Sequence, residues 1–495
     1  MARHRAPTTA LLLAALGATA ITTAPTTAPA AAVAREEAAG RLQIRIERPP
    51  AAADLVKVVV TGPDRYRTVL RRTTVLRGLA PGAHSVLARP IRLYDQHVDP
   101  YVFPGRVFRI PRDVGETVRV VYKNPELCRY RGSDTLSWGE ADAGALGVPT
   151  RTDRTRPGAV TLLHGITAVT GGRSNGYALC EGGTVWAWGD NGYGQLGNGK
   201  EGDRPYPVRV PLGPGHSAVA ALDRTGIALW RGTVTTWGWG QYGQLGDGEP
   251  WSASRVARRP VDVVGLTDVA AIAGGGYTAY ALKADGTVWA WGNGQIGQLG
   301  HGANEDRSTP VQVTGLTDVV QVAAGHDTAY ALRADGSVWA WGNGQQGQLG
   351  NGGVTSSNVP VPVTMPGGGT TAVAVGASYA AGYLVASDGT VHAWGSRRHG
   401  ALGDGTADAS WQVTPLPVPG LAGVARVLGR GRTAYAQLTD GTVWAWGSNS
   451  AGQVGAGLAP TGPAATDGVP DPTPVPALTG VTALGAGELT GYAVR

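Results

Sequence analysis

One motif recurs seven times along this chain: Trp-Gly, four residues, Gly, one residue, an aliphatic residue and Gly. Successive motifs are 49 to 54 residues apart, with a period near 51. Self-similarity at such a period is typical of repeat architectures, in which each unit needs its neighbours to bury its apolar face. The anchor tryptophans are Trp138, Trp188, Trp237, Trp291, Trp341, Trp394 and Trp446.

Each repeat predicts about four short β strands. Between Tyr280 and Gly300, apolar residues alternate up to Asp285-Gly286, a two-residue hairpin signal, and a second strand then ends at Trp291. A glycine-rich run, a proline-flanked segment and another apolar strand follow. Four-stranded units at this period are typical of propeller blades, so we expect an all-β fold of seven blades without helices.

The two ends of the propeller segment complement each other. In six repeats the position eleven residues before the anchor is usually tyrosine, whereas Trp138 has no matching strand ahead of it. The C-terminal residues supply that strand, with Tyr492 in the tyrosine position. We therefore expect the C-terminal strand to pair with the strand ending at Trp138, which removes open sheet edges. The six positions are Tyr177, Gly226, Tyr280, Tyr330, Tyr383 and Tyr435.

From Arg129 to Arg495, the WGxxxxGQLG anchors and the preceding DGTVWAW strands resemble the regulator of chromosome condensation repeat family, whose members form seven-bladed propellers. The chain departs from the pattern at Ala401, which replaces Gln, and at Val454, which replaces Leu. The family often places a histidine in the turn before the tyrosine strand, and here only His326 keeps it. The resemblance implies the fold, and it implies nucleotide exchange on a nuclear GTPase by fold alone.

A second resemblance concerns function. The WAWGDN sequence that begins at Trp186 is similar to blade motifs of propeller-type β-lactamase inhibitory proteins, which soil bacteria export. This chain differs from them by its longer repeat and its additional N-terminal segment. The resemblance implies, as a sub-hypothesis, inhibition of a secreted enzyme.

Residues 1–32 read as a secretory signal peptide, with Arg3 and Arg5 before the apolar stretch from Leu11 to Ile21 and a small-residue cleavage region around Ala30. The apolar stretch is too short to span a bilayer, although a retained membrane anchor is the alternative. We expect a secreted protein that does not span the membrane.

Residues 41–124 alternate apolar and polar positions between Pro and Gly turns, which predicts a small antiparallel β-sandwich. The sequences RGLAPGAHSVLA and ETVRVVY resemble prealbumin-like accessory domains of exported bacterial proteins. Residues 35–127 carry 17 Lys and Arg against 10 Asp and Glu, whereas the propeller segment, residues 128–495, carries 23 against 26. The basic segment could contact anionic wall polymer, or it could simply be a solvated surface. The arginines form no dense run with interleaved aromatic residues, so we expect no binding to nucleic acid.

The two cysteines, Cys128 and Cys180, fall in neighbouring blades of the predicted ring. Disulfides persist in the oxidising environment of secreted proteins, so we predict a bridge between them. Such a bridge would pin the first blade onto the ring and stabilise it by roughly 2–4 kcal/mol.

Neither a catalytic nor a metal- or cofactor-binding pattern emerges. The segment from Leu245 to Gly248 lacks the acidic ladder of a calcium loop, and other repeats carry neutral residues at that position. The histidines are scattered, and no nucleophile elbow is present. We therefore expect a protein that is not an enzyme and needs no cofactor or metal. A hydrolase is the minority hypothesis; it would need an acid-bearing cleft at the propeller mouth, which the uncharged Gly-Asn-Gly-Gln loops do not predict.

Large residues that break the repeat carry the binding hypothesis, because aromatic and arginine side chains on loops commonly anchor protein interfaces. The alternative is that Trp239 or Trp251 packs between blades or under a loop. We predict an exported, non-catalytic scaffold that presents one loop face to a partner protein; the alternative is a cell-wall or carbohydrate binder whose loop tryptophans stack on sugars. The candidate contact residues are Tyr193, Trp239, Tyr242, Trp251, Arg398 and His399.

Overall fold

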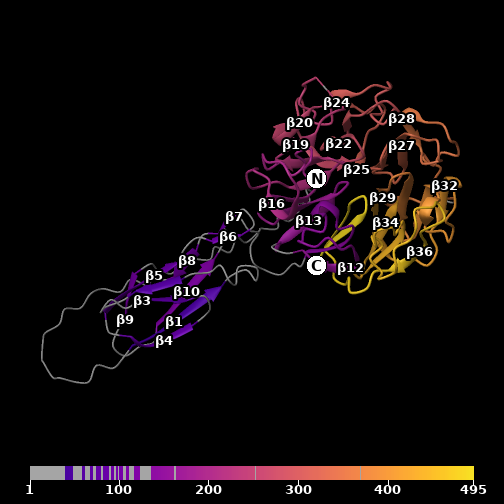
Figure 1. The fold of residues 1–495 in the computed structure, drawn as a ribbon. Helices are drawn as coiled ribbons and strands as arrows, with labels where there is room; N and C mark the ends of the chain where they lie inside the picture. Colours follow the sequence, from indigo (N-terminus) through magenta and orange to yellow (C-terminus); the bar gives the residue numbers. More distant parts are fainter. Residues whose placement is uncertain are drawn as a thin grey trace, which may run out of the picture.

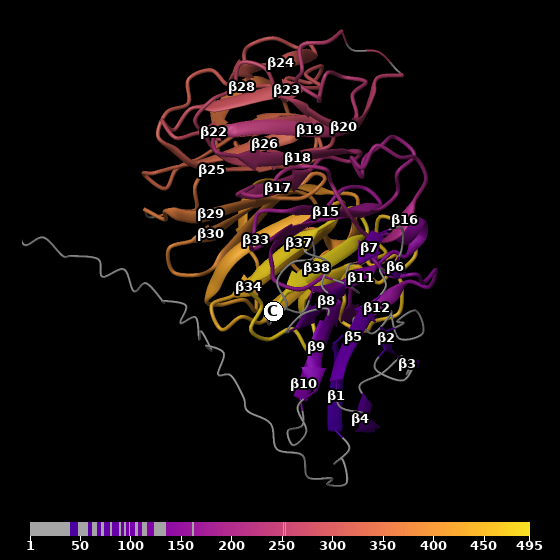
Figure 2. The same ribbon diagram turned by 90° about the vertical axis from the view of Figure 1, so that its left-hand side faces the viewer.

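The structure is a computed structural model that describes residues 135–160, 163–250, 252, 254–367 and 369–495, together with ten strands within residues 40–122. From residue 135 onward, seven four-stranded antiparallel sheets follow one another around a ring (Figure 1). Their innermost strands contact one another in the order β13, β17, β21, β25, β29, β33, β37 and again β13. Figure 2 shows the ring from another side, with β29, β33 and β37 layered in this order. The all-β, seven-bladed propeller predicted from the repeat is confirmed.

We number the blades I to VII in ring order and give the strands of each blade from the centre outward. Blade I contains β37 (Ala483–Ala486), β38 (Thr490–Val494), β11 (Thr135–Gly139) and β12 (Arg154–Ala159). Blade II contains β13 (Ile166–Gly171), β14 (Asn175–Cys180), β15 (Val185–Gly189) and β16 (Arg204–Arg209). Blade III contains β17 (Ala218–Ala221), β18 (Thr225–Trp230), β19 (Thr233–Trp239) and β20 (Val256–Asp262). Blade IV contains β21 (Val269–Gly274), β22 (Thr278–Lys283), β23 (Val288–Gly292) and β24 (Arg307–Gln312).

The remaining blades repeat this plan. Blade V contains β25 (Val319–Ala324), β26 (Thr328–Arg333), β27 (Val338–Gly342) and β28 (Ser357–Pro362). Blade VI contains β29 (Ala372–Ala377), β30 (Ala381–Ala386), β31 (Val391–Ser396) and β32 (Trp411–Pro417). Blade VII contains β33 (Val424–Arg430), β34 (Thr433–Leu438), β35 (Val443–Gly447) and β36 (Val469–Pro474). The outermost strand of every blade includes proline, which removes hydrogen-bond donors from the exposed edge.

Blade I combines strands from both ends of the propeller segment. Strand β38 pairs antiparallel with β11, so that Tyr492 lies opposite Ser137 and Gly491 lies opposite Trp138. The indole Nε1 of Trp138 also donates to the carbonyl of Gln453 in blade VII, 2.8 Å away. The first and last strands of the ring therefore share one sheet.

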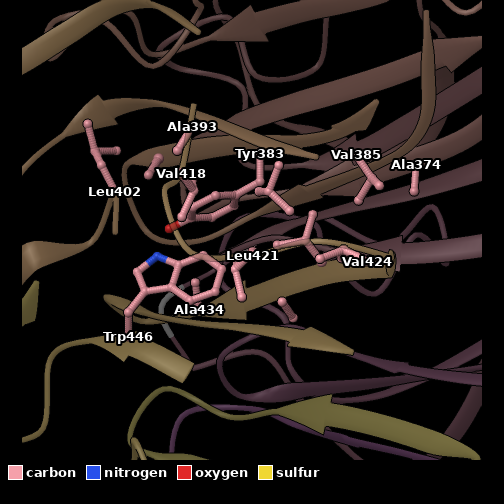
Figure 3. Close-up of a cluster of buried hydrophobic side chains, with 14 residues drawn as sticks. Ala374, Tyr383, Val385, Ala393, Leu402, Val418, Leu421, Val424, Ala434 and Trp446 are labelled. Carbon is pink, nitrogen blue, oxygen red and sulfur yellow. The ribbon is translucent and has the colours of Figure 1, made fainter. Parts of the chain in front are cut away.

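The repeated motif joins each blade to the next through one carbonyl group. In blade IV the Tyr280 hydroxyl donates to the carbonyl of Gln298, and the Nε1 of Trp341, from blade V, donates to the same oxygen; the distances are 2.7 and 2.9 Å. Figure 3 shows the equivalent pair between blades VI and VII, where the rings of Tyr383 and Trp446 meet edge-on at 5.9 Å. The tyrosine and tryptophan of the motif are thus a buried hydrogen-bonded joint as well as core.

The last glycine of each motif lies against the tryptophan of the next blade. Gly300 has a φ of +67°, and a Cβ atom there would lie 2.8 Å from the Trp341 ring. A side chain at this position would be strained and would also collide with a buried indole, because positive φ is cheap only for glycine. The conserved spacing of Trp and Gly within the motif therefore sets the distance between blades.

Blade III departs from the predicted register by one residue. Its second and third strands are joined by a two-residue turn, Arg231-Gly232, in which both residues have positive φ. In blade IV the equivalent loop has three residues, and the N–H of Lys283 donates to the carbonyl of Thr287 across it, so the two-residue hairpin predicted at Asp285-Gly286 is wrong. Because the blade III loop is shorter, Ile227 rather than Gly226 occupies the tyrosine position.

Two short 3-10 helices occur in the described part, η2 (Asp142–Gly144) and η3 (Arg398–Gly400). Elsewhere the motif glutamine accepts a hydrogen bond from the backbone two residues earlier, as Gln298 Oε1 does from Ile296. In blades I and VI alanine replaces that glutamine, and the residue two positions earlier, Ala143 or His399, has positive φ. The expectation of a fold without helices holds except at these two turns.

The N-terminal strands form sheets of their own. One sheet has the order β4 (Thr74–Leu79), β1 (Gly40–Glu47), β10 (Glu116–Tyr122), β8 (Pro100–Phe103), and the other has the order β3 (Arg67–Leu70), β2 (Val58–Thr61), β5 (Gly82–Ala88), β9 (Val107–Ile110). Strands β6 (Ile91–Leu93) and β7 (Gln96–Val98) form a hairpin. Strand β1 pairs parallel to β10, so the prediction of a purely antiparallel arrangement is wrong. The two strands are far apart in sequence, which permits the long connection that parallel pairing requires.

Candidate functional site

One end of the ring carries both the turns between first and second strands and the long loops after third strands; we call this end the loop face. Backbone hydrogen bonds hold turn and loop together within each blade. In blade III the N–H of Trp239 donates to the carbonyl of Arg224 at 2.9 Å, and in blade IV Asn293 donates to Tyr277 at 3.0 Å. Side chains from a turn and from the neighbouring loop therefore meet at fixed positions on this face.

The turns of successive blades are linked around the centre of the loop face. The N–H of Arg173 donates to the carbonyl of Asp223, the N–H of Asp223 to Gly276, and the N–H of Gly276 to His326, each at 2.9 to 3.0 Å. His326 continues the series to the carbonyl of Tyr379 at 3.3 Å. These bonds run between blades II and VI, and they make the mouth of the propeller a rigid frame.

Arg430 of blade VII spans this mouth. Its guanidinium donates to Asp223 Oδ1 in blade III at 2.9 Å and to the carbonyls of Ala221, Gly274 and Gly275 at 2.9 to 3.3 Å. Blades III and IV lie across the ring from blade VII, so the side chain crosses the central axis. The Arg430 and Asp223 side chains are only 15% and 11% exposed, which makes this a largely buried ion pair.

His326 joins the same network. Its Nδ1 lies 2.9 Å from Asp327 Oδ2 and its Nε2 lies 3.5 Å from Asp223 Oδ2. Burial lowers the pKa of His326, but the hydrogen bonds and charges of the two carboxylates outweigh it and raise the pKa to about 9. For Asp223, burial raises the pKa, while His326 and Arg430 outweigh it and hold the pKa below its usual value. The imidazole is therefore protonated near neutral pH and is unsuited to act as a general base.

A small cavity of about 20 Å³, room for about one water molecule, adjoins this network. Asp223, His326, Tyr379, Arg430 and Glu488 line it together with glycines of the central turns. Burial, followed by the charge of Asp223, raises the pKa of Glu488. The glycine-rich loops predict no acids at the mouth, and the two acids found there, Asp223 and Glu488, come instead from the central turns.

Aromatic side chains form a continuous band from the outer loops of blades II and III to the mouth. Trp239 contacts Tyr193, Tyr242 and Tyr277 with ring centroids 5.5, 5.7 and 5.4 Å apart. Tyr277 contacts His326 at 5.5 Å, and His326 contacts Tyr379 at 4.5 Å. We call these six residues the aromatic band: Tyr193, Trp239, Tyr242, Tyr277, His326 and Tyr379.

Within the band, Trp239 is the buried centre. It is only 8% exposed, whereas Tyr193, Tyr242 and Tyr277 are half-buried and Tyr379 is 36% exposed. The structure thus brings together three of the predicted contact residues, Tyr193, Trp239 and Tyr242, but it places Trp239 under its neighbours. The alternative of packing under a loop is the correct one for Trp239, because three tyrosine rings cover it.

Two other candidates lie apart from the band. Arg398 is exposed, whereas His399 is buried, and its Nδ1 lies 3.0 Å from the carbonyl of Asp467 in blade VII. Both belong to η3 of blade VI, three blades from Trp239, so His399 is a packing residue and not a surface contact. Trp251 lies outside the described residues.

Only one cysteine of the predicted disulfide lies in the described part of the structure. Cys180 is buried at the end of β14, and Cys128 lies outside the described residues. The bridge stays a prediction.

The residues that sequence reasoning missed all belong to the central turns. Tyr277 and Arg224 immediately precede the second strand of their blades, and Tyr379 lies two residues before it. The available signal was an alignment of the repeats at this position, where most blades carry small or polar residues. Neither Tyr277 nor Tyr379 is a tryptophan, and neither lies in a long loop. The contact residues predicted from the sequence were mostly of these two kinds.

No metal site is apparent: across the described ranges, no group of three or more His, Cys, Asp or Glu side chains could hold an ion. Nor does any described helix have the length and apolar character needed to cross a membrane.

Comparison with known protein families identifies the repeat. Residues 182–221, 231–282, 285–332 and 335–382 match the Regulator of chromosome condensation (RCC1) repeat, and residues 166–195, 269–298 and 319–348 match a second description of the same repeat. The protein is thus a seven-bladed β-propeller that contains RCC1 repeats between residues 166 and 382. No curated protein matches the chain by sequence.

Solved structures share the fold. Prp20p from Saccharomyces cerevisiae is similar at a TM-score of 0.64 and 22% identity, over 74% of this chain and 92% of that one. Yeast RCC1 (Prp20) bound to Kap60 has a TM-score of 0.63 at 22% identity, over 75% of this chain and 90% of that one. Human WBSCR16 has a TM-score of 0.63 at 24% identity, over 74% of this chain and 99% of that one. At these identities the likeness concerns the fold alone.

Proposed function

We propose that the protein is a non-catalytic binding scaffold that presents its loop face to a partner protein. The observation that carries this proposal is the aromatic band, whose half-buried tyrosines rest on the buried Trp239 and on the rigid frame of the mouth. Large aromatic side chains held in fixed rotamers lose little entropy on binding, and they dominate the energetics of protein interfaces.

The solved structures of the same fold support a scaffold of this kind. Prp20p was studied for its binding to Gsp1p and histones, and yeast RCC1 (Prp20) was crystallised bound to Kap60. These partners belong to those proteins. For this chain we propose only the general role, a propeller that binds protein.

The geometry of the band favours protein over carbohydrate. Sugars stack on exposed aromatic faces, but Trp239 is buried. The Tyr379 ring contacts His326 at 4.5 Å and the Arg432 guanidinium at 4.9 Å. Arg224 lies over one face of Tyr193, 4.7 Å from the ring centroid. The band therefore offers ring edges, hydroxyls and guanidinium groups, which suit the polar and apolar groups of a protein surface.

Affinity capture tests the proposal. The full chain, a band variant with Tyr242→Ala and Tyr277→Ala, and a control with Trp411→Ala would each be used as bait on the producer's culture medium and wall fraction. Trp411 is 48% exposed on the outer strand of blade VI, outside the band. We expect the full chain and the control to recover one protein that the band variant loses. Recovery by all three baits, or retention on wall polymer alone, would reject the loop face as the binding surface.

The inhibitory role is a narrower proposal about the same partner. If the recovered protein is a secreted enzyme, addition of the full chain should reduce its activity and addition of the band variant should not. If the enzyme's activity is unchanged at a saturating concentration of the full chain, the protein binds the enzyme without inhibiting it.

We also propose that the protein is exported and that residues 41–124 form a β-sandwich accessory domain resembling prealbumin. The positively charged start and the short apolar stretch of residues 1–32 support export. The two four-stranded sheets within residues 40–122 support a sandwich. Mass spectrometry of protein from the culture medium should find an N-terminus near residue 32, whereas a full-length cytoplasmic product would contradict export.

A further inference from the structure

The tyrosines of the band differ from the tyrosines of the core in their hydrogen bonding. Every core tyrosine at the motif position uses its hydroxyl, as Tyr280 does with the carbonyl of Gln298. Among the described residues, none provides a hydrogen bond to the hydroxyls of Tyr193, Tyr242, Tyr277 or Tyr379. The band therefore presents donors to solvent in fixed positions.

Two arginines on the same face also lack an acidic partner. The Arg224 guanidinium lies over the rings of Tyr193 and Trp239, 4.7 and 5.4 Å from their centroids, and Arg432 lies over Tyr379. Within the described part of the chain, neither forms an ion pair with a carboxylate. The stacking contacts hold each guanidinium in place, and the Nε of Arg224 is buried without a hydrogen-bond partner. A guanidinium that is held in position but has no acidic partner suits recognition of a carboxylate.

The acids of the central turns are already engaged with other cations. Asp223 binds Arg430 and His326, Asp327 binds His326, and Glu488 lies 3.5 Å from Arg173. These three acids balance the three cations Arg430, His326 and Arg173, which leaves Arg224 and Arg432 without a carboxylate partner in the described part of the chain. The charge that remains uncompensated along the band is positive.

We infer that the band receives an acidic segment of the partner protein, whose carboxylates accept hydrogen bonds from Arg224, Arg432 and the tyrosine hydroxyls. This inference rests on the proposed function and specifies the chemistry of its partner. Complementary charge would select such a segment from others and would speed its association. Nucleic acid, the other common polyanion, fits less well, because bases bind by stacking on ring faces, and an arginine already occupies one face of Tyr193 and one face of Tyr379.

The test is selection of peptides displayed on phage from a random library, with the full chain as bait. A second bait carries Arg224→Glu and Arg432→Glu, and a control bait carries Arg398→Glu, which changes an exposed arginine of the same face outside the band. A labelled single-stranded oligonucleotide is tested against each bait in parallel.

We expect peptides enriched on the full chain and on the control to contain an excess of Asp and Glu. A chosen acidic peptide should bind the Arg224→Glu, Arg432→Glu variant at least about tenfold more weakly, as expected for the loss of charge-assisted hydrogen bonds. Its Gln and Asn counterpart should bind the full chain about tenfold more weakly than the acidic form.

Enrichment without an acidic excess, enrichment unaffected by the two substitutions, or no enrichment over the variant would each overturn the inference. So would binding of the oligonucleotide that depends on Arg224 and Arg432. These outcomes are independent of the capture experiment: a partner lost with Tyr242→Ala and Tyr277→Ala but kept with both arginine substitutions would preserve the proposed function and reject the acidic segment.

Discussion

The guanidinium of Arg430 crosses the axis of the propeller and donates to Asp223, 207 positions away in the chain, at 2.9 Å. Three carbonyl oxygens from blades III and IV also accept from its two terminal nitrogens, whereas Nε has no partner among the described residues. A buried charge is tolerated only when it is paired and hydrogen-bonded, and both conditions hold here. The pair ties blade VII to the opposite side of the ring and forms the floor beneath the cavity that adjoins the aromatic band.

Arg430→Met should therefore destabilise the ring. We expect a loss of about 3 kcal/mol in the free energy of unfolding, because Asp223 and three carbonyls lose their main donor inside the protein. Chemical denaturation of the variant and of the parent chain measures this difference in the free energy of unfolding. The control is Arg333→Met, which removes longer ion pairs to Asp318 and Asp335 near a hairpin and should cost less than about 1 kcal/mol. Equal losses in the two variants would contradict the special role of the central pair.

His326 should make stability depend on pH above neutrality. Its pKa is about 9 in the folded protein and about 6.5 when unfolded, so the stabilisation is complete below pH 6.5 and is lost as the pH rises to 9. The expected decrease is roughly 3 kcal/mol, measured as denaturation midpoints between pH 6 and pH 9.5. His326→Gln should lack this decrease. A variant with the same slope as the parent chain would show that another group titrates.

Gly300→Ala should destabilise the joint between blades IV and V. The new methyl group would lie 2.8 Å from the Trp341 ring at a φ of +67°, so strain and collision add. Gly315→Ala is a matched control, since it has a similar φ of +73° with open space around the added carbon. We expect about 1–2 kcal/mol for the control and about 3 kcal/mol or more for Gly300→Ala. Similar values would mean that the close approach to Trp341 is relieved at no cost.

Tyr280→Phe isolates the hydroxyl of the blade joint. The Gln298 carbonyl would keep the Nε1 donor of Trp341 and lose only one of its two hydrogen bonds. The expected cost is about 1 kcal/mol in the free energy of unfolding. Tyr277→Phe, whose hydroxyl has no partner among the described residues, should leave stability within about 0.5 kcal/mol of the parent chain. A larger effect at Tyr277 than at Tyr280 would contradict the division between core and band tyrosines.

Glu140, beside the mouth in blade I, should oppose folding at high pH. Burial and then the charge of Asp142 raise its pKa to about 7, although the Ser174 hydroxyl donates to it at 3.3 Å. Its ionisation therefore costs more in the folded protein than in the unfolded chain, and the penalty grows between pH 4.5 and pH 7. Glu140→Gln should raise the melting temperature at pH 8 and leave it nearly unchanged at pH 4. A lower melting temperature at pH 8 would contradict this sign.

Much of the fold follows from local pattern. The anchor tryptophans and the alternating strands predict seven four-stranded blades, because each repeat encodes its own hairpins and its own contacts to the next repeat. The prediction fails where a loop changes length: a two-residue turn at Arg231-Gly232 shifts the register, and Ile227 replaces Gly226 at the tyrosine position. A spacing counted from the anchor cannot detect such a shift, since loop length and strand register compensate each other.

The candidate site was predicted only in part. Tyr193, Trp239 and Tyr242 attract notice because they interrupt a repeat of small residues, and the structure brings them together. Which of them is exposed does not follow from sequence, because Trp239 is buried by rings from blades II and IV as well as its own.

The sequence alone determined the number of blades, the tryptophan and glycine joints between them, and the unusual residues of the loops. These features are repeated and local, so periodicity and steric rules suffice to read them. Three relationships appear only in the folded molecule: Arg430 meets Asp223 across the axis, two carboxylates hold His326 protonated, and Tyr277 and Tyr379 extend the band to the mouth. Those relationships depend on closing the ring, which brings together turns that lie up to some two hundred residues apart in the chain.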